Sequence, residues 1–317
     1  MLIVSTLGLE EEYRKQLKEN CPQYEVKHID TLLELSEEEL GKVEILLTYG
    51  NGMTENIVSK MSSLKWVHSG QAGIEQMPQK LLKEKRVKVT NSRGINSITI
   101  AEYVLCMLLN LERNTYKFYE AYKAKKWDME THLDEIAGKI ISILGLGKVG
   151  MEIAKRAKAF DMHVIGVDLS SVNSEYIDEV YLPVDINRVA SKSDYLVICM
   201  PLTKDTYHMI DKDVIQKMKN TATIVNVGRG PIVNMEDLVL ALNSDKIRAA
   251  VIDVFDEEPV LPDSELWNVK NMIITPHIAG DRQKSYMPRM MKIMCNNLNL
   301  YPDFQKMTNP VNLELGF

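Results

Sequence analysis

The feature that most limits the possible folds is a series of short apolar segments, rich in β-branched residues, in the second part of the 317-residue sequence. Interiors that are almost wholly apolar are typical of parallel strands covered by helices on both faces. The segments are residues 139–145, 163–168, 194–200, 221–227, 247–255 and 271–276. Helical patterns at about 148–160, 207–219 and 234–244 lie between them and predict right-handed crossovers. We therefore predict a doubly wound α/β domain.

A second, similar series occupies the first hundred residues. Its predicted elements are strands at 1–5, 24–29, 43–48, 65–69 and 87–91 and helices at 9–20 and 54–61. A long helix is predicted at about 98–122, and a methionine-rich helical pattern, interpreted as core, begins near residue 282. No low-complexity linker divides the chain, so we expect it to cross between domains near residue 98 and to return at its end. The predicted fold class is α/β, with two doubly wound parallel-sheet domains.

The composition is that of an ordinary globular protein and limits the possible partners. Hydrophobic residues make up 45% of the chain and charged residues 26%, which excludes a disordered chain. The net charge of −6 argues against nucleic acid, and the longest apolar run, residues 98–111, contains Glu102 and is too short to cross a membrane. Four scattered cysteines without CxxC spacing and an N-terminus without a signal-peptide pattern predict the cytoplasm. No metal site is expected.

The segment ILGLGKVG contains the pattern G-x-G-x-x-G between a predicted strand and a predicted helix, where a dinucleotide-binding loop requires it. Gly145, Gly147 and Gly150 form the pattern, and Asp168 ends the next strand, 18 residues past Gly150. This spacing predicts a pyrophosphate on the helix N-terminus and a carboxylate that accepts hydrogen bonds from the ribose. Because a carboxylate repels a 2′-phosphate, NAD is favoured over NADP. An FAD site and an empty Rossmann-like core are the alternatives.

Three side chains suited to catalysis follow three successive predicted strands. Arg229, Glu258 and His277 each come within three residues of a strand end. Singly, each has an ordinary explanation: a solvated turn, an acid in a charged run, or a structural histidine. Open α/β sheets bind ligands at the carboxyl ends of their strands. A guanidinium there can grip a carboxylate, and an imidazole can donate a proton near neutral pH.

Several further motifs extend this pattern. They are CMPLTKDTYHMID (199–211), NVGRG (226–230), DVFDEEP (253–259) and TPHIAG (275–280), with looser matches in SGQAG (69–73) and NSITIAEYVL (96–105). Together with GLGKVG they make the chain similar to the D-isomer-specific 2-hydroxyacid dehydrogenase family. The resemblance spans nearly the whole chain, and its cofactor half is highly specific.

The resemblance implies an NAD-dependent oxidoreductase that interconverts a 2-keto acid and a D-2-hydroxy acid and that forms a homodimer. It implies a Rossmann coenzyme domain (98–283) inserted in a flavodoxin-like substrate domain (1–97 and 284–317). In this family Arg229 would bind the substrate carboxylate, His277 would exchange the proton, and Glu258 would pair with the imidazole. The implied cofactor contacts are Gly145, Gly147, Lys148, Val149, Gly150, Asp168, Pro201, Thr206, Val227, Gly228, Asp253, His277 and Gly280.

The substrate domain is less well defined. By resemblance, the amides of Ala72 and Gly73 would bind the substrate carboxylate, but the loop that contains them is one residue longer than the family's pattern. The remaining candidates for the pocket are Tyr49, Asn51, Gly52, His68, Arg93, Asn96 and Tyr286. An NAD-sensing interaction protein of the corepressor type is the alternative function, because such proteins can retain the same three side chains. A relative of S-adenosylhomocysteine hydrolase fits poorly.

Overall fold

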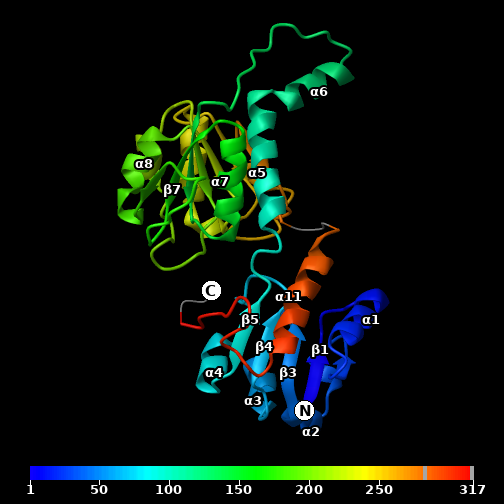
Figure 1. Cartoon of the computed structure of the whole chain (residues 1–317). Coiled ribbons are helices and arrows are strands. Elements are labelled where there is room, and N and C mark those ends of the chain that lie inside the picture. Colours follow the sequence, from blue (N-terminus) through cyan, green and yellow to red (C-terminus); the bar gives the residue numbers. More distant parts are fainter. Residues whose placement is uncertain (281–283, 315–317) are drawn as a thin grey trace. The chain divides into compact units, whose positions relative to one another are not determined.

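The structure is a computed structural model that describes residues 1–280 and 284–314. The chain divides into two compact units (Figure 1). Unit 1 comprises residues 1–95 and 283–317, and unit 2 comprises residues 96–282. Each unit has its own parallel sheet, so the predicted fold class is confirmed.

Unit 1 is built on five parallel strands in the order β2-β1-β3-β4-β5. The strands are β1 (Leu2–Ser5), β2 (Val26–His28), β3 (Val43–Thr48), β4 (Trp66–Ser69) and β5 (Lys88–Asn91). The helices are α1 (Glu11–Asn20), α2 (Glu37–Lys42), α3 (Glu55–Lys60), α4 (Gln79–Glu84) and α11 (Tyr286–Leu300). The sequence prediction missed α2 and α4, each of which has only six residues.

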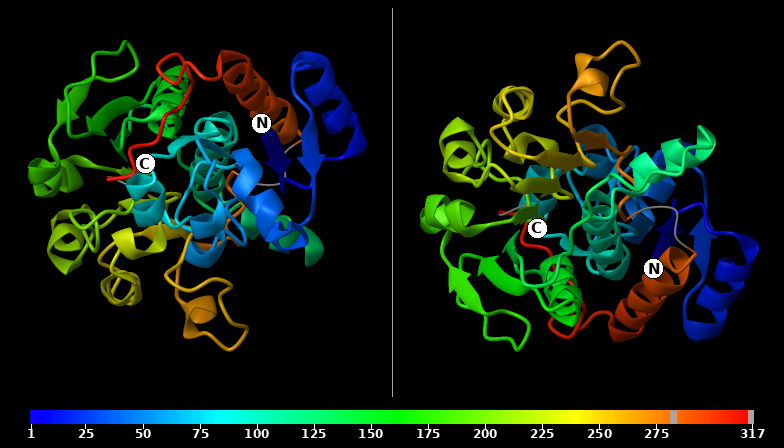
Figure 2. Two further views of the ribbon diagram at one scale, coloured as in Figure 1. Left: turned by 90° about the horizontal axis from the view of Figure 1, so that it is seen from below. Right: turned by 90° about the horizontal axis from the view of Figure 1, so that it is seen from above.

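The C-terminal helix α11 belongs to the core of unit 1. It lies beside α1 in each view of Figures 1 and 2. Its residues Met290, Met291 and Met294 are fully buried and share a hydrophobic cluster with Ile3 and Trp66 of the sheet. The interpretation of the methionine-rich pattern as core is confirmed.

Unit 2 has seven parallel strands in the order β12-β11-β10-β9-β6-β7-β8. The strands are β6 (Ile140–Leu144), β7 (His163–Val167), β8 (Glu179–Tyr181), β9 (Tyr195–Ile198), β10 (Thr223–Asn226), β11 (Ala249–Ile252) and β12 (Met272–Ile274). The chain runs outward from β6 to β8 and then returns to β9 on the other side of β6. This reversal is the topological switch point, where open α/β sheets bind their ligands.

Helices cover both faces of this sheet. They are α5 (Ser97–Glu112), α7 (Lys148–Ala159), α8 (Ile186–Lys192), α9 (Lys212–Lys217) and α10 (Met235–Asn243). A further helix, α6 (Thr115–Lys123), follows α5, has no buried residue and does not cover the sheet. α5 and α7 pack in one hydrophobic cluster with the sheet, and α8, α9 and α10 pack in the other. Burial of both faces explains why the strands are almost wholly apolar.

The structure corrects three predictions for unit 2. The single helix expected at 98–122 is two helices, because Asn114 adopts a left-handed conformation (φ 48°) between α5 and α6. The helix expected at 207–219 begins only at Lys212, where Asp211 caps it. β8 and α8 were not predicted, since β8 is three residues long and lies at the edge of the sheet. After α6 the chain continues without helix or strand to β6, and this segment, residues 124–139, is called the arm (Figure 1).

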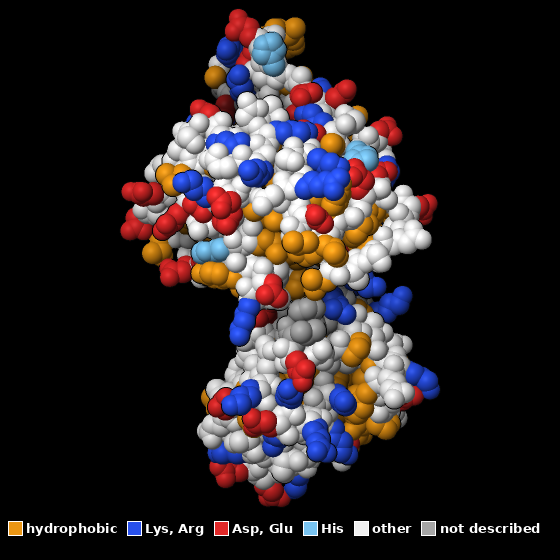
Figure 3. All heavy atoms as spheres, turned by 90° about the vertical axis from the view of Figure 1, so that its left-hand side faces the viewer, with side chains coloured by type: hydrophobic (Ala, Val, Ile, Leu, Met, Phe, Trp, Pro, Cys, Tyr) orange, Lys and Arg blue, Asp and Glu red, His pale blue; other side chains and the backbone are white. Residues whose placement is uncertain are grey.

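Acidic and basic side chains alternate over the face of the molecule shown in Figure 3, in keeping with the modest net charge. Among the helices within residues 1–280 and 284–314, none combines the length and the apolar character needed to cross a bilayer.

Candidate active site

The glycine loop joins β6 to α7 and leaves an open approach to the helix N-terminus. Gly145 has a φ of +99°, and a Cβ there would lie 2.9 Å from Met200 Cα. A Cβ on Gly150 would lie 2.0 Å from the carbonyl oxygen of Gly145, so the helix can pack this close to the strand only with glycine. By contrast, a Cβ on Gly147, which caps α7, would have no atom within 4 Å. This open space and the free end of the helix fit the pyrophosphate of a dinucleotide.

Asp168 lies directly beside this loop, one residue past the end of β7. Its Oδ2 accepts a hydrogen bond from Leu146 N (2.8 Å), and its Oδ1 accepts one from Leu169 N (2.8 Å). The carboxylate therefore helps to shape the glycine loop, a role that the sequence reasoning did not predict. Each carboxylate oxygen can accept a further hydrogen bond, so the arrangement fits a ribose diol.

The turn that carries Arg229 is held by a buried asparagine. Asn226, at the end of β10, accepts a hydrogen bond from Gly228 N (3.1 Å) and donates one to Arg229 O (3.0 Å). A Cβ on Gly230 would lie 2.2 Å from the carbonyl carbon of Phe255, so the turn is packed against the loop that follows β11. The sequence analysis included Asn226 in the NVGRG motif but assigned it no role. An amide side chain at the end of an otherwise largely apolar strand was the available signal.

The Arg229 side chain is half-buried at this turn. Its Nη1 donates to the carbonyl oxygen of Gly228 (2.8 Å). This short contact keeps the guanidinium folded close to the end of β10. The sheet order places β10 next to β11 and β11 next to β12, so Arg229 shares one sheet edge with the loops of Glu258 and His277.

Glu258 and His277 form a direct pair. Glu258 Oε2 lies 2.8 Å from His277 Nδ1, and Glu258 Oε1 accepts a hydrogen bond from Phe255 N (2.9 Å). Because an ionised carboxylate only accepts, His277 Nδ1 carries a proton, which leaves Nε2 as the atom that can exchange one. About half of the His277 side chain is exposed (51%). The pair can therefore act as an oriented acid or base at an accessible position.

Asp253 holds the backbone on either side of this histidine. It is 1% exposed. Its Oδ1 accepts from Ile278 N (2.9 Å), its Oδ2 accepts from Ala279 N (2.9 Å), and its backbone oxygen accepts from His277 N (2.9 Å). These bonds hold His277 in a left-handed conformation (φ 52°), which is uncommon for a residue other than glycine. The predicted contact of Asp253 with the cofactor stays a prediction.

The other predicted cofactor residues lie in the loops that follow β6, β9, β10 and β12. Thr206 Oγ1 accepts a hydrogen bond from Thr203 N (2.7 Å) and donates to Pro201 O (2.9 Å), so this hydroxyl shapes its own turn. Lys148 and Val149 begin α7. The chain thus places the predicted residues along one edge of the sheet in unit 2.

In unit 1, the loop of Ala72 and Gly73 is fixed through its carbonyl groups. Asn91 Nδ2 donates to Ala72 O (2.7 Å), and Ser69 Oγ donates to Gly73 O (3.3 Å). Gln71, in the longer loop, donates through its side chain to the backbone oxygen of Tyr49 (3.1 Å).

His68, a predicted pocket residue, is instead a core residue of unit 1. It is fully buried, and its ring nitrogens lie 2.8 Å from Thr90 Oγ1 and 3.4 Å from Ser92 Oγ. Burial lowers the pKa of His68 to about 3, so the ring stays neutral. Tyr286 donates to Gly70 O (2.9 Å), which ties α11 to the loop after β4.

The fold and these side chains define a dinucleotide-binding α/β protein with an arginine and a carboxylate–histidine pair at one sheet edge. Residues 105–279, more than half of the chain, match the family described as D-isomer specific 2-hydroxyacid dehydrogenase, NAD binding domain. The chain belongs to this family, and unit 2 contains its NAD-binding domain.

Individual relatives agree with this assignment. A D-3-phosphoglycerate dehydrogenase of Methanocaldococcus jannaschii is 33% identical over 274 residues, which cover 82% of this chain and 51% of that protein. A glyoxylate reductase of Thermofilum pendens is 30% identical over 251 residues, covering 76% of this chain and 73% of that protein. The crystal structure of a D-isomer specific 2-hydroxyacid dehydrogenase family protein from Aeromonas salmonicida subsp. salmonicida superposes with a TM-score of 0.86 at 29% identity, covering 98% and 99% of the two chains. The chain spans only about half the length of the phosphoglycerate dehydrogenases that it matches.

Proposed function

We propose that this protein is an NAD-dependent oxidoreductase that interconverts a 2-keto acid and a D-2-hydroxy acid. The observation that carries the proposal is the His277–Glu258 pair, which shares a sheet edge with Arg229 in an NAD-binding domain. In this proposal unit 2 is the coenzyme domain, and unit 1 is the substrate domain. The cytoplasm is the proposed location.

The residues divide the chemistry among them. Bound NADH supplies the hydride. Arg229 binds the carboxylate and places a fixed positive charge beside the carbonyl oxygen, where negative charge develops. His277 Nε2 donates the proton to that oxygen in reduction and removes it in oxidation. Glu258 holds the imidazole in the required tautomer, and the amides of Ala72 and Gly73 also bind the carboxylate.

We also propose that NAD is preferred over NADP. Asp168 accepts a hydrogen bond from the glycine loop itself, which keeps its negative charge next to the ribose position. A 2′-phosphate there would meet this charge. Comparing NADH and NADPH at equal concentration measures the preference, and stronger turnover with NADPH contradicts the role given to Asp168.

A panel of 2-keto acids tests the activity. Glyoxylate and 3-phosphohydroxypyruvate belong in the panel because relatives are named glyoxylate reductase and D-3-phosphoglycerate dehydrogenase. Pyruvate, hydroxypyruvate and branched-chain keto acids complete it. Reduction of one of them with NADH is expected. Retained NADH binding without turnover of any acid refutes the proposal and favours an NAD sensor of the corepressor type.

Variants of Arg229 test the site itself. Loss of a charge that pairs directly with substrate lowers kcat/KM by about 100-fold or more, so kcat/KM of Arg229→Ala is expected to be lower than that of the wild type by this factor. Arg229→Lys keeps the charge but not the planar guanidinium, so its kcat/KM should lie between those of the wild type and Arg229→Ala. Arg188→Ala, which removes an exposed arginine of α8, is the matched control and should retain full activity. Equal activity in all three variants contradicts the assignment.

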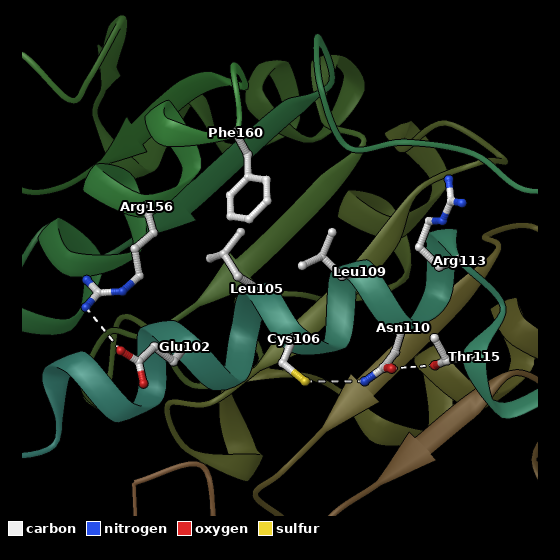
Figure 4. Close-up of a pocket in the computed structure, with 9 residues that line it drawn as sticks. All are labelled: Glu102, Leu105, Cys106, Leu109, Asn110, Arg113, Thr115, Arg156 and Phe160. Carbon is white, nitrogen blue, oxygen red and sulfur yellow. Dashed lines mark hydrogen bonds and ion pairs between the residues drawn. The ribbon is translucent and has the colours of Figure 1, made fainter. Parts of the chain in front are cut away.

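We further propose that unit 2 forms a homodimer through α5, α6 and the arm. Exposed aromatic side chains line α6, and Trp127 and Met129 of the arm are 87% and 80% exposed. Residues of α5, the start of α6 and the end of α7 line an open pocket of about 480 Å³ (Figure 4). Its apolar lining consists largely of Leu105, Leu109 and Phe160. A group of exposed apolar side chains beside an apolar pocket is typical of a protein–protein interface.

The charges near this pocket support a second copy of the chain as its occupant. Arg113 and Arg156 line the pocket together with Glu102, and Arg156 already pairs with Glu102 (3.5 Å) and with Glu152. In the arm two acids, Asp128 and Glu130, flank Met129. We propose that the partner's arm places its apolar side chains in the pocket and its acids beside Arg113. Sedimentation should show a dimer for the wild type and dissociation for Trp127→Ala combined with Met129→Ala.

A thiol in the pocket gives an independent readout. Cys106 is exposed in the single chain and lines the pocket. Its alkylation is expected to slow as the protein concentration rises and the dimer forms. An alkylation rate that does not depend on protein concentration, with unchanged sedimentation of the double variant, contradicts this interface.

A further inference from the structure

A chain of hydrogen bonds connects helix α5 to the loop of His277. Tyr103, on α5, places its hydroxyl 2.6 Å from Thr275 Oγ1. Thr275 Oγ1 in turn lies 2.6 Å from Asp253 Oδ1. The three residues come from sequence positions far apart, and each contact is short for a hydrogen bond between oxygen atoms.

The direction of donation along this chain follows from the last acceptor. The Asp253 carboxylate can only accept, so the single hydroxyl proton of Thr275 is donated to it. The contact between Tyr103 and Thr275 must then be a donation from the phenol. Burial, with a smaller contribution from nearby Asp253, raises the pKa of Tyr103, which keeps this proton in place. Tyr103 therefore donates to Thr275, and Thr275 donates to Asp253.

This chain of hydrogen bonds ends on the Asp253 carboxylate, which fixes the backbone around His277, the proposed general acid. Oδ1 of Asp253 accepts from Thr275 and from Ile278 N, and Oδ2 accepts from Ala279 N. Without the hydroxyl of Thr275, Oδ1 would keep only the hydrogen bond from Ile278 N, and the carboxylate would be held by one bond fewer. A carboxylate that is held less firmly would also hold the two amides that directly follow His277 less firmly.

We propose that Tyr103 and Thr275 are positioning residues, which act through Asp253 to hold His277 in its working orientation. The expected effect on kcat rests on the proposed function. The expected effect on the loop itself does not, because the loop has this geometry without substrate. Neither residue needs to touch the reacting atoms.

Thr275→Val tests the chain with a side chain of nearly the same shape. Loss of one hydrogen bond to a buried carboxylate is expected to lower kcat by about tenfold, while KM for the keto acid changes by less than about threefold. Thr275→Ser restores the hydroxyl and should recover most of kcat. Tyr103→Phe should have a smaller effect, since Thr275 still donates to Asp253. Thr221→Val, at an exposed threonine, is the matched control and should not change kcat.

Hydrogen–deuterium exchange of the protein without substrate or cofactor separates this proposal from the proposed function. Amides of Ile278 and Ala279 should exchange about tenfold faster in Thr275→Val than in the wild type, and Thr275→Ser should restore slow exchange. If no keto acid is turned over but exchange accelerates in this way, the positioning chain stands and the proposed activity fails. Equal exchange and equal kcat in the Val and Ser variants overturn the proposal.

Discussion

The carboxylate of Glu112 joins three other side chains at the end of α5, and replacing it with glutamine provides a sharp test of how unit 2 is stabilised. The side chain is only 1% exposed. It accepts hydrogen bonds from Tyr195 (2.6 Å), from Lys139 (2.9 Å) and from both terminal nitrogens of Arg248. Glu112→Gln keeps the size of the side chain but removes its charge and turns one acceptor into a donor.

The structure sets the size of the effect. A hydrogen bond to a charged group contributes about 1.5–3 kcal/mol, and at least two such bonds are lost. Arg248 and Lys139 remain 34% and 23% exposed, so water can solvate them again and offset part of the loss. We therefore expect the free energy of unfolding to fall by about 3 kcal/mol, which corresponds to about a hundredfold in the opening equilibrium.

The effect should depend on pH in a defined direction. Burial acts to raise the pKa of Glu112, but the hydrogen bonds from Arg248, Tyr195 and Lys139 outweigh it and the pKa is lowered. A carboxyl whose folded pKa lies below its unfolded value of about 4.3 stabilises the fold above that pH. The difference between the wild type and Glu112→Gln should be complete above about pH 5 and shrink as the pH falls below about 4.

Hydrogen–deuterium exchange of the amides in β6 and β9 is the appropriate assay, because it reports on unit 2 without assuming that the whole chain unfolds in one step. Glu120→Gln, which removes an exposed ion pair of α6, is the control and should leave exchange unchanged. Exchange in Glu112→Gln that equals the control at pH 7 refutes the reasoning, as does a difference that grows toward acid.

Three further outcomes follow from the geometry. In Gly230→Ala the new Cβ would lie 2.2 Å from the carbonyl carbon of Phe255, so the turn must move, and keto-acid reduction should fall by about a hundredfold in steady-state kinetics. Asp168→Ala removes a hydrogen bond to the glycine loop, and the Kd for NADH in a fluorescence titration should rise by about tenfold. Burial lowers the pKa of His68 to about 3, so unit 1 should lose stability as the pH falls from about 6.5 to 3, measured by amide exchange in β4.

Each of these outcomes has its own control. Gly147→Ala meets no atom within 4 Å and should keep the fold of unit 2, which distinguishes a backbone clash from the simple loss of a glycine. NADPH binding should weaken less than NADH binding in Asp168→Ala, and equal weakening contradicts the proposed preference. For unit 1, His68→Asn should remove much of the pH dependence, and an unchanged profile rules out His68 as its source.

The regular part of the fold was predictable because strands and helices leave a local pattern. β3 matches its predicted range, residues 43–48, and the glycine loop lies between β6 and α7 as expected. The helix break at Asn114 was not predictable, since the helical spacing of apolar residues continues past it and the interruption depends on one backbone conformation. β8 lies at the sheet edge, where burial imposes no apolar pattern.

The supporting residues of the site were harder to predict than the site itself. Asn226 and Thr275 stand in the same motifs as Arg229 and His277, but their roles depend on contacts with segments that only folding brings close. Both lie at or just past the end of an apolar strand, which marks them as unusual but does not identify a partner. His68 is the opposite case, a residue predicted to line the substrate pocket that lies in the core. A histidine at a strand end can also form its hydrogen bonds with neighbouring hydroxyl groups inside a core.

The left-handed backbone at His277 makes this residue an indicator of function in other members of the lineage. Asparagine and glycine adopt this conformation at lower cost than histidine does. A descendant that keeps the fold but no longer performs the reaction has no reason to retain the imidazole, and the backbone then favours asparagine or glycine. The residue at this one position should therefore distinguish active relatives from those that have kept only the scaffold.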